Sequence, residues 1–165
     1  MNVDFLGSTC NEPVRTNKLF GLCDNQDSTK AYSNLDAPTT WIADVINEEE
    51  IEVVFTPIDW CIIVFQANSK KKESTCDGML TTKNSLFLVE LKDQMANWQT
   101  EAFNQLENTM KLILANHDLS QFTYKKGFAC NKKSKRFNFI ENELNLKFFR
   151  AYGFRIDSNR KIVIK

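Results

Sequence analysis

The sequence lacks several features that would mark a membrane, secreted or zinc-binding protein. No apolar run approaches the roughly 20 residues that a membrane-spanning helix needs, and the longest, around Cys61–Phe65, has only the length of a strand. The first residues, Met1 to Phe5, show no basic stretch followed by an apolar one, the pattern of a signal peptide. Histidine occurs once, at His117, and no C-x-x-C pair exists, so a structural zinc site is not expected. We therefore expect a soluble, cytoplasmic protein that does not enter a membrane.

Cysteine is present but is not arranged as a disulfide framework. The five cysteines stand at positions 10, 23, 61, 76 and 130. An odd number with wide spacing is not typical of a set of structural disulfides. The sequence predicts reduced thiols, as in cytoplasmic proteins.

Length and composition are those of one globular domain. The chain has 165 residues, of which 42% are hydrophobic and 25% are charged, enough to bury a core and ordinary for a soluble protein. Neither an internal repeat nor a linker is visible. We expect a single domain over residues 1–165, with an N-terminal extension that contains a hairpin (1–58) and a core (59–165).

The net charge of zero hides an asymmetry along the chain. Residues 1–120 hold 9 Lys and Arg against 18 Asp and Glu, whereas residues 121–165 hold 12 against 3. The basic runs are 70–72 and 132–136. Such an asymmetry either favours binding of a polyanion or lets the two halves neutralise each other in the fold.

Two helices are predicted from apolar residues at helical spacing. The first covers 94–115, with Asp93 as its N-terminal cap, and the second covers 141–152 and ends at Gly153. Strands are predicted at 18–22, 75–81, 85–92 and 121–130, and hairpins at 41–46 with 51–56 and at 154–157 with 161–164. Residues 41–46 also fit a helix, and residues 60–66 fit a buried strand or a short helix. Trp60 and Trp98 are expected in the core, and His117 at the surface beyond a helix end.

The predicted strand at 85–92 carries the chemistry. Because side chains alternate between the faces of a strand, one face carries Leu86 and Leu88 followed by Glu90 and Lys92. Both faces begin apolar, which indicates a central strand buried on both sides. Charges buried there need partners.

A hairpin with the preceding strand brings a second acid to the same point. If Lys83 and Asn84 form a two-residue loop, Asp77 lies opposite Glu90, with Cβ atoms roughly 5 Å apart. Two carboxylates this close repel each other unless a cation lies between them, and Mg²⁺ prefers oxygen ligands. The alternative is that Lys92 simply neutralises Glu90 while Asp77 lies in a turn beside Gly78. Spacing alone leaves both interpretations open.

These residues resemble a known signature. The sequence Cys76-Asp77-Gly78-Met79-Leu80, a short gap and Phe87-Leu88-Val89-Glu90-Leu91-Lys92 is similar to the D…E-x-K motif of the PD-(D/E)XK nuclease superfamily, with Cys76 in place of the nominal Pro. The wider pattern, with Gly21-Leu22-Cys23-Asp24 near the start and Gly153-Phe154 after the last helix, is similar to a group of small bacterial proteins over nearly the whole chain.

The resemblance implies a fold and a set of roles. It implies an α/β (α+β) protein with a restriction-endonuclease-like core, a mixed central sheet flanked by helices. Asp77, Glu90 and the backbone carbonyl of Leu91 would bind Mg²⁺ or Mn²⁺, Lys92 would orient or activate the attacking water, and Gln105 would contact that water or the amine. The superfamily usually adds a Glu from an earlier helix. The candidates for that acid are Glu48, Glu49, Glu50 and Asp59, none of which lies in a convincing helix.

Two functions follow as hypotheses. The first is metal-dependent hydrolysis of phosphodiester bonds in DNA, by an enzyme that could act as a homodimer. The second is a non-catalytic binding or interaction protein that retains the nuclease-like scaffold, for instance with a protein partner in a defence or toxin system.

Overall fold

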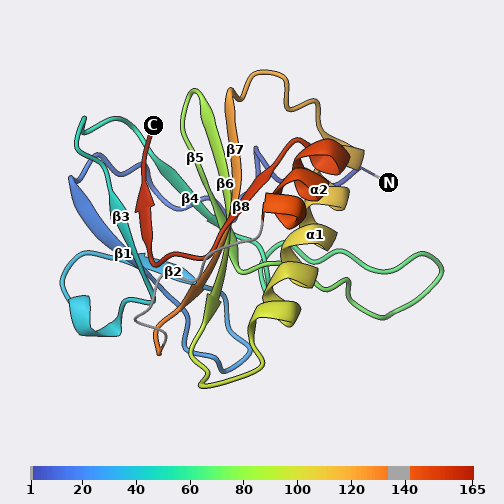
Figure 1. Ribbon diagram of the computed structural model, residues 1–165, viewed down its shortest axis with the longest axis horizontal. Coiled ribbons are helices and arrows are strands. Elements are labelled where there is room, and N and C mark those ends of the chain that lie inside the picture. Colours follow the sequence, from blue (N-terminus) through green and yellow to red (C-terminus); the bar gives the residue numbers. More distant parts are fainter. Residues whose placement is uncertain (1, 134–141) are drawn as a thin grey trace.

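The fold combines two mixed β-sheets with helices, which confirms the expected α/β (α+β) class (Figure 1). The computed structural model describes residues 2–133 and 142–165. The five-stranded sheet has the order β4 (Val54–Pro57), β5 (Gly78–Thr81), β6 (Ser85–Lys92), β7 (Tyr124–Asn131) and β8 (Arg155–Asp157). The four-stranded sheet has the order β2 (Tyr32–Asn34), β1 (Leu19–Cys23), β3 (Ala43–Ile46) and β9 (Lys161–Val163). The helices are α1 (Gln99–Asn116), α2 (Asn142–Tyr152) and a short 3-10 helix at Pro38–Thr40.

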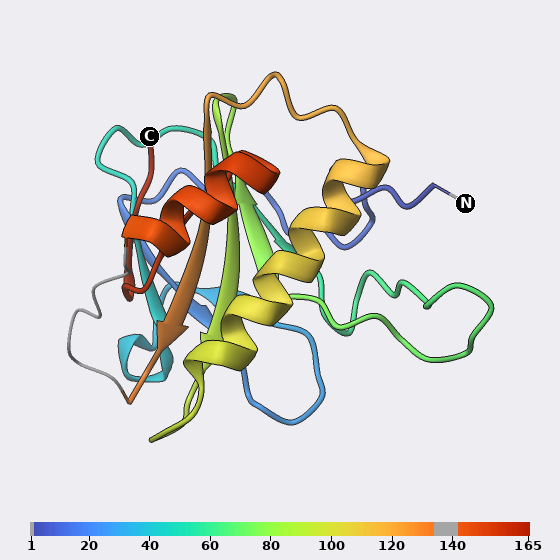
Figure 2. The same ribbon diagram turned by 45° about the vertical axis from the view of Figure 1, so that its right-hand side comes forward.

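The five-stranded sheet is the middle of three layers (Figures 1 and 2). On one face, α1 and α2 form a core with the sheet through residues such as Leu88, Leu106 and Phe148. On the other face, the four-stranded sheet forms a second core through residues such as Phe20 and Phe87. Helices therefore cover one face of the central sheet, whereas a second sheet covers the other.

Strand β6 is the buried central strand that the sequence predicts. All eight of its residues are buried, and β5 and β7 pair with its two edges. Leu86 and Leu88 belong to the helix-side core, while Phe87 and Val89 belong to the core between the sheets. By the same alternation, Glu90 and Lys92 point toward α1.

The hairpin between β5 and β6 has the predicted register. Gly78 pairs with Val89 and Met79 pairs with Leu88, and the Thr82 N–H donates to the Ser85 carbonyl across the two-residue loop at 2.9 Å. Continuing this register by one residue brings Asp77 opposite Glu90, as predicted.

The helix boundaries differ from the predictions at one end. Helix α1 begins at Gln99 rather than 94, so Asp93 is not its cap, and the Trp98 position makes no side-chain cap hydrogen bond. Helix α2 ends as predicted at Gly153, whose φ of +75° suits glycine and whose N–H donates to the Phe149 carbonyl at 2.8 Å.

Both remaining hairpins were predicted wrongly. Strand β3 pairs with β1 and β9, whereas β4 pairs with β5 in the other sheet. Likewise β8 runs parallel to β7, and β9 runs parallel to β3. In both cases the two strands thus lie in different sheets, and β4, which comes from the segment 1–58, belongs to the central sheet.

The segment at 60–66 is neither a strand nor a helix but part of an arm (residues 59–74) that projects at the right of Figures 1 and 2, although Ile62 within it is buried. Trp60, expected in the core, is 46% exposed. Cys61 forms a disulfide with Cys10, so the prediction of reduced thiols is wrong for this pair. Cys23, Cys76 and Cys130 are free and buried.

His117, expected at the surface, is only partly exposed, and its Nε2 accepts a hydrogen bond of 3.0 Å from the Phe5 N–H.

Of the basic run at 132–136, residues 134–136 lie outside the described residues. Neither of the α-helices within residues 2–133 and 142–165 combines the length and apolar character needed to cross a bilayer.

Candidate metal centre

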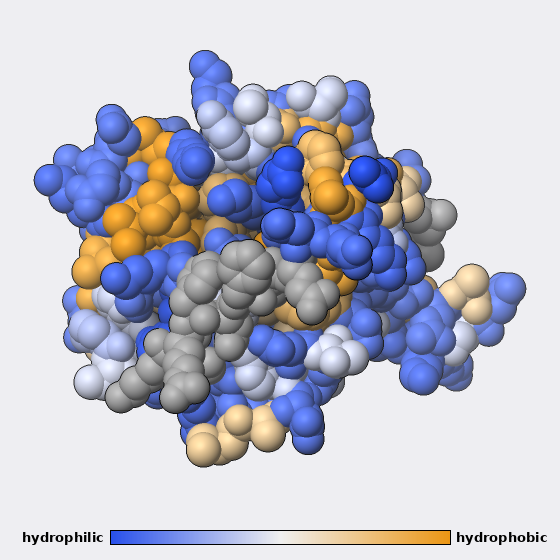
Figure 3. All heavy atoms as spheres, viewed as in Figure 1, coloured by the Kyte–Doolittle hydropathy of each residue, from blue (hydrophilic) through white to orange (hydrophobic). Residues whose placement is uncertain are grey.

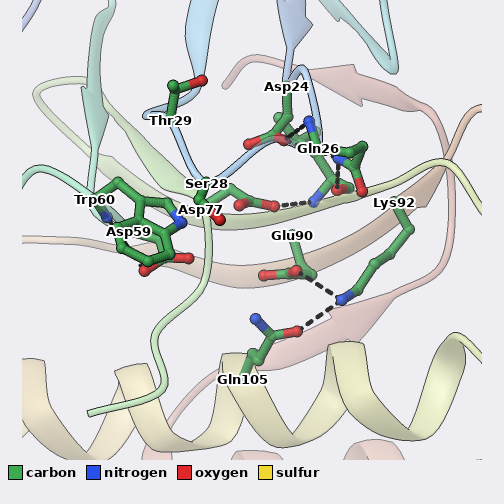
Figure 4. Close-up of a pocket in the computed structure, with 11 residues that line it drawn as sticks. Asp24, Gln26, Ser28, Thr29, Asp59, Trp60, Asp77, Glu90, Lys92 and Gln105 are labelled. Atoms are coloured by element: carbon green, nitrogen blue, oxygen red, sulfur yellow. Dashed lines mark hydrogen bonds and ion pairs between the residues drawn. The ribbon is translucent and has the colours of Figure 1, made fainter. Parts of the chain in front are cut away.

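The candidate site is a small polar cavity at the C-terminal end of β6. Its volume is about 160 Å³. Strand β6, the segment before β5, helix α1, the loop after β1 and the start of the arm all contribute side chains (Figure 4). The cavity therefore brings together segments far apart in the chain. All five predicted site residues line it, namely Asp77, Glu90, Leu91, Lys92 and Gln105.

Asp77 and Glu90 are the buried acids of this cavity. Asp77 is 7% exposed and Glu90 is 2% exposed. Asp77 Oδ2 accepts a hydrogen bond of 2.7 Å from the Leu91 N–H. Within the described part of the chain, Glu90 Oε2 is buried and has no hydrogen-bond partner. A buried carboxylate oxygen without a partner is costly, and a bound cation would remove that cost.

The pKa values of both acids reflect this crowding. The pKa of Asp77 is raised to about 7, mainly by burial; the nearby charges of Asp24 and Asp59 also raise it, while the Leu91 hydrogen bond and Lys92 lower it. Burial also raises the pKa of Glu90 well above its ordinary value, and the charge of Asp77 acts in the same direction. The folded protein thus holds two carboxyls that resist ionisation in the absence of a counter-charge.

Lys92 and Gln105 lie on the helix side of the cavity, as Figure 4 shows. Lys92 Nζ donates to Gln105 Oε1 at 2.9 Å and lies 3.3 Å from Glu90 Oε1 and 3.1 Å from Glu101 Oε1. Burial acts to lower the pKa of Lys92, but the two carboxylates outweigh it and raise the pKa above its ordinary value. Lys92 is therefore a positively charged group at neutral pH, held in place by α1.

The loop after β1 contributes an acid that the sequence reasoning did not assign to the site. Asp24 lines the cavity, and its pKa is raised, mainly by burial. The side chain of Gln26 lies beside it, with Nε2 donating to Asp24 Oδ1 at 2.8 Å and to the Leu91 carbonyl at 3.1 Å. An acid directly after an apolar strand was the available signal, but nothing local showed that β1 ends beside β6.

Of the four acids proposed from the sequence as a further ligand, only Asp59 lines the cavity. Glu48, Glu49 and Glu50 are exposed in the turn after β3 and do not line the cavity. Asp59 does line it, because the chain after β4 continues beside Cys76 and Asp77. Its carboxylate is already paired with Lys72 of the arm. Asp24 is thus a further acid of the cavity, in addition to Asp77 and Glu90, and it comes from a loop rather than from a helix.

The residues present fit a cation that keeps much of its water. Among the described residues, no group of three or more His, Cys, Asp and Glu side chains is arranged to hold a metal ion. Mg²⁺ is often bound by one or two carboxylates together with water, and Asp77 and Glu90 supply that pair. The Leu91 carbonyl, the third predicted ligand, already accepts a hydrogen bond from Gln26.

Comparison of the chain with protein-family models, with curated proteins and with solved structures found no match.

Proposed function

We propose that this protein is a metal-dependent phosphodiesterase of the PD-(D/E)XK type that acts on DNA. The observation that carries the proposal is the position of Asp77, just before β5, opposite Glu90 of β6. The Lys92 Nζ atom lies 3.3 Å from Glu90 Oε1. One or two carboxylates together with water often bind Mg²⁺, and a positively charged amine beside them can interact with a phosphate.

In this proposal the two acids bind the ion, and Asp24, which also lines the cavity, adds negative charge. A bound Mg²⁺ or Mn²⁺ would polarise the phosphate and offset charge on the leaving oxygen. Asp77 is oriented for this role by the Leu91 N–H. Glu90 contributes the oxygen that has no protein partner within the described residues.

Lys92 acts as a charged donor rather than as a base. Because its pKa is raised, the ammonium group stays protonated at neutral pH and can donate to the attacking water or to a phosphate oxygen. Gln105 accepts one of its protons and so fixes the direction of the amine. Hydrolysis then forms a bond from the water oxygen to phosphorus while that water loses a proton to solvent, and it breaks the bond to the leaving oxygen, which takes a proton from solvent.

The start of the basic segment 132–136 supports DNA as the substrate. Strand β7 pairs in parallel with β6, so that Asn131 lies beside Lys92, and the Lys132 N–H donates to the Lys92 carbonyl at 2.9 Å. The segment thus begins at the same edge of the sheet as the acid pair. The described lysines of the run, Lys132 and Lys133, are positively charged groups that can contact phosphates, which supply much of the affinity for DNA.

A plasmid-nicking assay with Mg²⁺ or Mn²⁺ tests the proposal. We expect nicking by the wild type, none in EDTA, and none above background for Asp77→Asn or Glu90→Gln. Glu107→Gln, which changes an acid of α1 away from the cavity, is the matched control and should retain activity. Activity that survives both site substitutions would contradict the assigned roles.

The second candidate is a non-catalytic protein with the same scaffold. It is favoured by the absence of a three-ligand cluster among the described residues and by the Gln26 contact on the Leu91 carbonyl. A thermal-shift titration with Mn²⁺ separates the two functions. A shift that depends on Glu90 supports the enzyme, whereas no shift at millimolar Mn²⁺ supports the scaffold.

A further inference from the structure

An exposed tryptophan lies at the edge of the candidate metal centre. Trp60 lines the same cavity as Asp77 and Glu90, and Figure 4 shows it beside Asp59. It is 46% exposed, whereas Trp41 and Trp98 are 4% and 7% exposed. Burying an aromatic ring is strongly favourable, so a tryptophan left open beside a polar cavity suggests a ligand that packs on it.

The local backbone holds Trp60 in this position. Its φ is +63°, a left-handed conformation that is uncommon for a bulky residue. The neighbouring Cys61 is tied to Cys10 by the disulfide, and the Asp59 carboxylate accepts a hydrogen bond of 3.1 Å from the Trp60 N–H. Unusual backbone conformations that the surroundings enforce are concentrated at functional sites.

The arm around Trp60 combines aromatic and basic side chains. Lys72 Nζ lies 4.6 Å from the centroid of the Trp60 ring and also pairs with Asp59. Phe65 is exposed, and its backbone forms an antiparallel β-bridge with that of Lys72 across the arm. Lys70 and Lys71 are exposed at the far end of the arm. In Figure 3 the far end of the arm is mainly hydrophilic. Aromatic rings flanked by lysines are typical of surfaces that bind single-stranded nucleic acid.

We propose that Trp60 stacks on an unpaired base next to the scissile phosphate, so that the preferred substrate is single-stranded DNA or an unpaired DNA end. This inference rests on the proposed function, because it names the substrate of that same site. In a duplex, each base is already stacked on its neighbours, and its face is not open to a side chain. A base beside Trp60 must therefore come from an unpaired strand, whose phosphates Lys70 and Lys71 can approach.

The wild-type chain can be tested without cleavage, in EDTA and at low salt. A single-stranded 12-mer of deoxythymidine should quench the tryptophan fluorescence, since Trp60 is the exposed member of the three tryptophans. Anisotropy of the same labelled oligonucleotide should give a dissociation constant about tenfold lower than that of a 12-base-pair duplex. Equal affinity for both, or no quenching, would overturn the inference.

Variants assign the effect to the ring. Trp60→Ala should raise the dissociation constant for the single strand about tenfold, and Trp60→Phe should recover most of the loss. The matched control is Phe149→Ala, because Phe149 is also exposed and also has a cation over its ring, Arg155 at 4.5 Å. If Trp60→Ala and Phe149→Ala behave alike, the inference is wrong.

The two proposals can fail separately. Tight, Trp60-dependent binding of single strands without any cleavage in Mn²⁺ would contradict the proposed function and leave the stacking role in place. Cleavage of duplex plasmid that depends on Glu90 but not on Trp60 would contradict the stacking role and leave the proposed function in place.

Discussion

The carboxylate of Asp77 and the backbone of Leu91 are joined by a hydrogen bond of 2.7 Å from the Leu91 N–H to Oδ2. This bond connects the segment before β5 to the end of β6. It keeps the Asp77 carboxylate beside Glu90, although burial and neighbouring charges disfavour two ionised acids there. The site thus keeps an arrangement that reduces the stability of the metal-free protein, a common feature of functional sites.

The first prediction concerns how the stability of the metal-free protein depends on pH. The pKa of Asp77 is about 7 in the folded protein against an ordinary value of 3.8. Between these values the folded state holds a proton that the unfolded state has lost, so this contribution to stability falls as the pH rises from about 4 to about 7. Glu90, whose pKa is also raised, contributes in the same direction. The charge of Lys92 lowers the pKa of both acids and so makes the effect smaller.

Chemical denaturation at several pH values in EDTA checks this prediction. Asp77→Asn keeps an acceptor for the Leu91 N–H but cannot ionise, so its advantage over the wild type should grow with pH by up to about 1.4 kcal/mol per unit in this range. Asp118→Asn, at an exposed position, serves as the control. A constant difference between Asp77→Asn and the wild type from pH 4 to pH 8 would show that Asp77 is not the titrating group.

The second prediction concerns Gln26. Its Nε2 donates to Asp24 Oδ1 and to the Leu91 carbonyl, two oxygens that could otherwise face a cation. Gln26→Ala should therefore raise the affinity for Mn²⁺, by about tenfold if roughly one net hydrogen bond no longer competes. Titration calorimetry measures this affinity, with Gln121→Ala at an exposed position as the control. A weaker affinity in Gln26→Ala would mean that Gln26 helps to bind the ion instead of competing with it.

The third prediction concerns the Lys92 charge. Removing one member of a buried ion pair leaves the other uncompensated, so Lys92→Met should cost about 3 to 5 kcal/mol in the metal-free protein. Adding Glu90→Gln to Lys92→Met should restore most of the loss, which a double-mutant cycle measures. Mn²⁺ should stabilise Lys92→Met more than the wild type, because the ion compensates Glu90 directly. If the two substitutions are simply additive, the 3.3 Å contact carries no coupling energy.

The fourth prediction concerns the Cys10–Cys61 disulfide. It closes a loop of 51 residues, for which the chain-entropy account predicts a stabilisation of about 4 kcal/mol. Dithiothreitol should lower the free energy of unfolding of the wild type by up to this amount and should leave the Cys10→Ser/Cys61→Ser variant unchanged. Cys76 and Cys130 are fully buried, and burial raises the pKa of each thiol, so neither should react with a thiol reagent before unfolding. An equal response of wild type and variant to the reductant would contradict the presence of this disulfide.

Features decided by local sequence were predictable. The alternation in β6 and the short loop at Lys83 and Asn84 were sufficient to predict that Asp77 lies opposite Glu90, because a two-residue loop determines the register of a hairpin. The position of Gly153 was predictable for the same kind of reason, since a left-handed helix end favours glycine.

Features decided by distant contacts were not predictable. Strands β8 and β9 look like a hairpin from the sequence, but β8 pairs in parallel with β7, the strand before α2, and β9 pairs in parallel with β3, which is far away in the chain. Asp24 reaches the site only because the four-stranded sheet packs on the five-stranded one, and Trp60 stays exposed although Ile58 and Ile62 on either side of it are buried. Apolar character alone does not reveal which surface, if any, will cover a residue.

A crystal structure of the protein soaked in Mn²⁺, with anomalous scattering used to locate the ion, would show whether a metal binds at the end of β6. We expect one strong anomalous peak between the carboxylates of Asp77 and Glu90, and its loss in Glu90→Gln crystals soaked in the same way. A soaked wild-type crystal with no peak at the end of β6, or with Asp77 and Glu90 turned away from each other, would show that the two acids do not form a metal site.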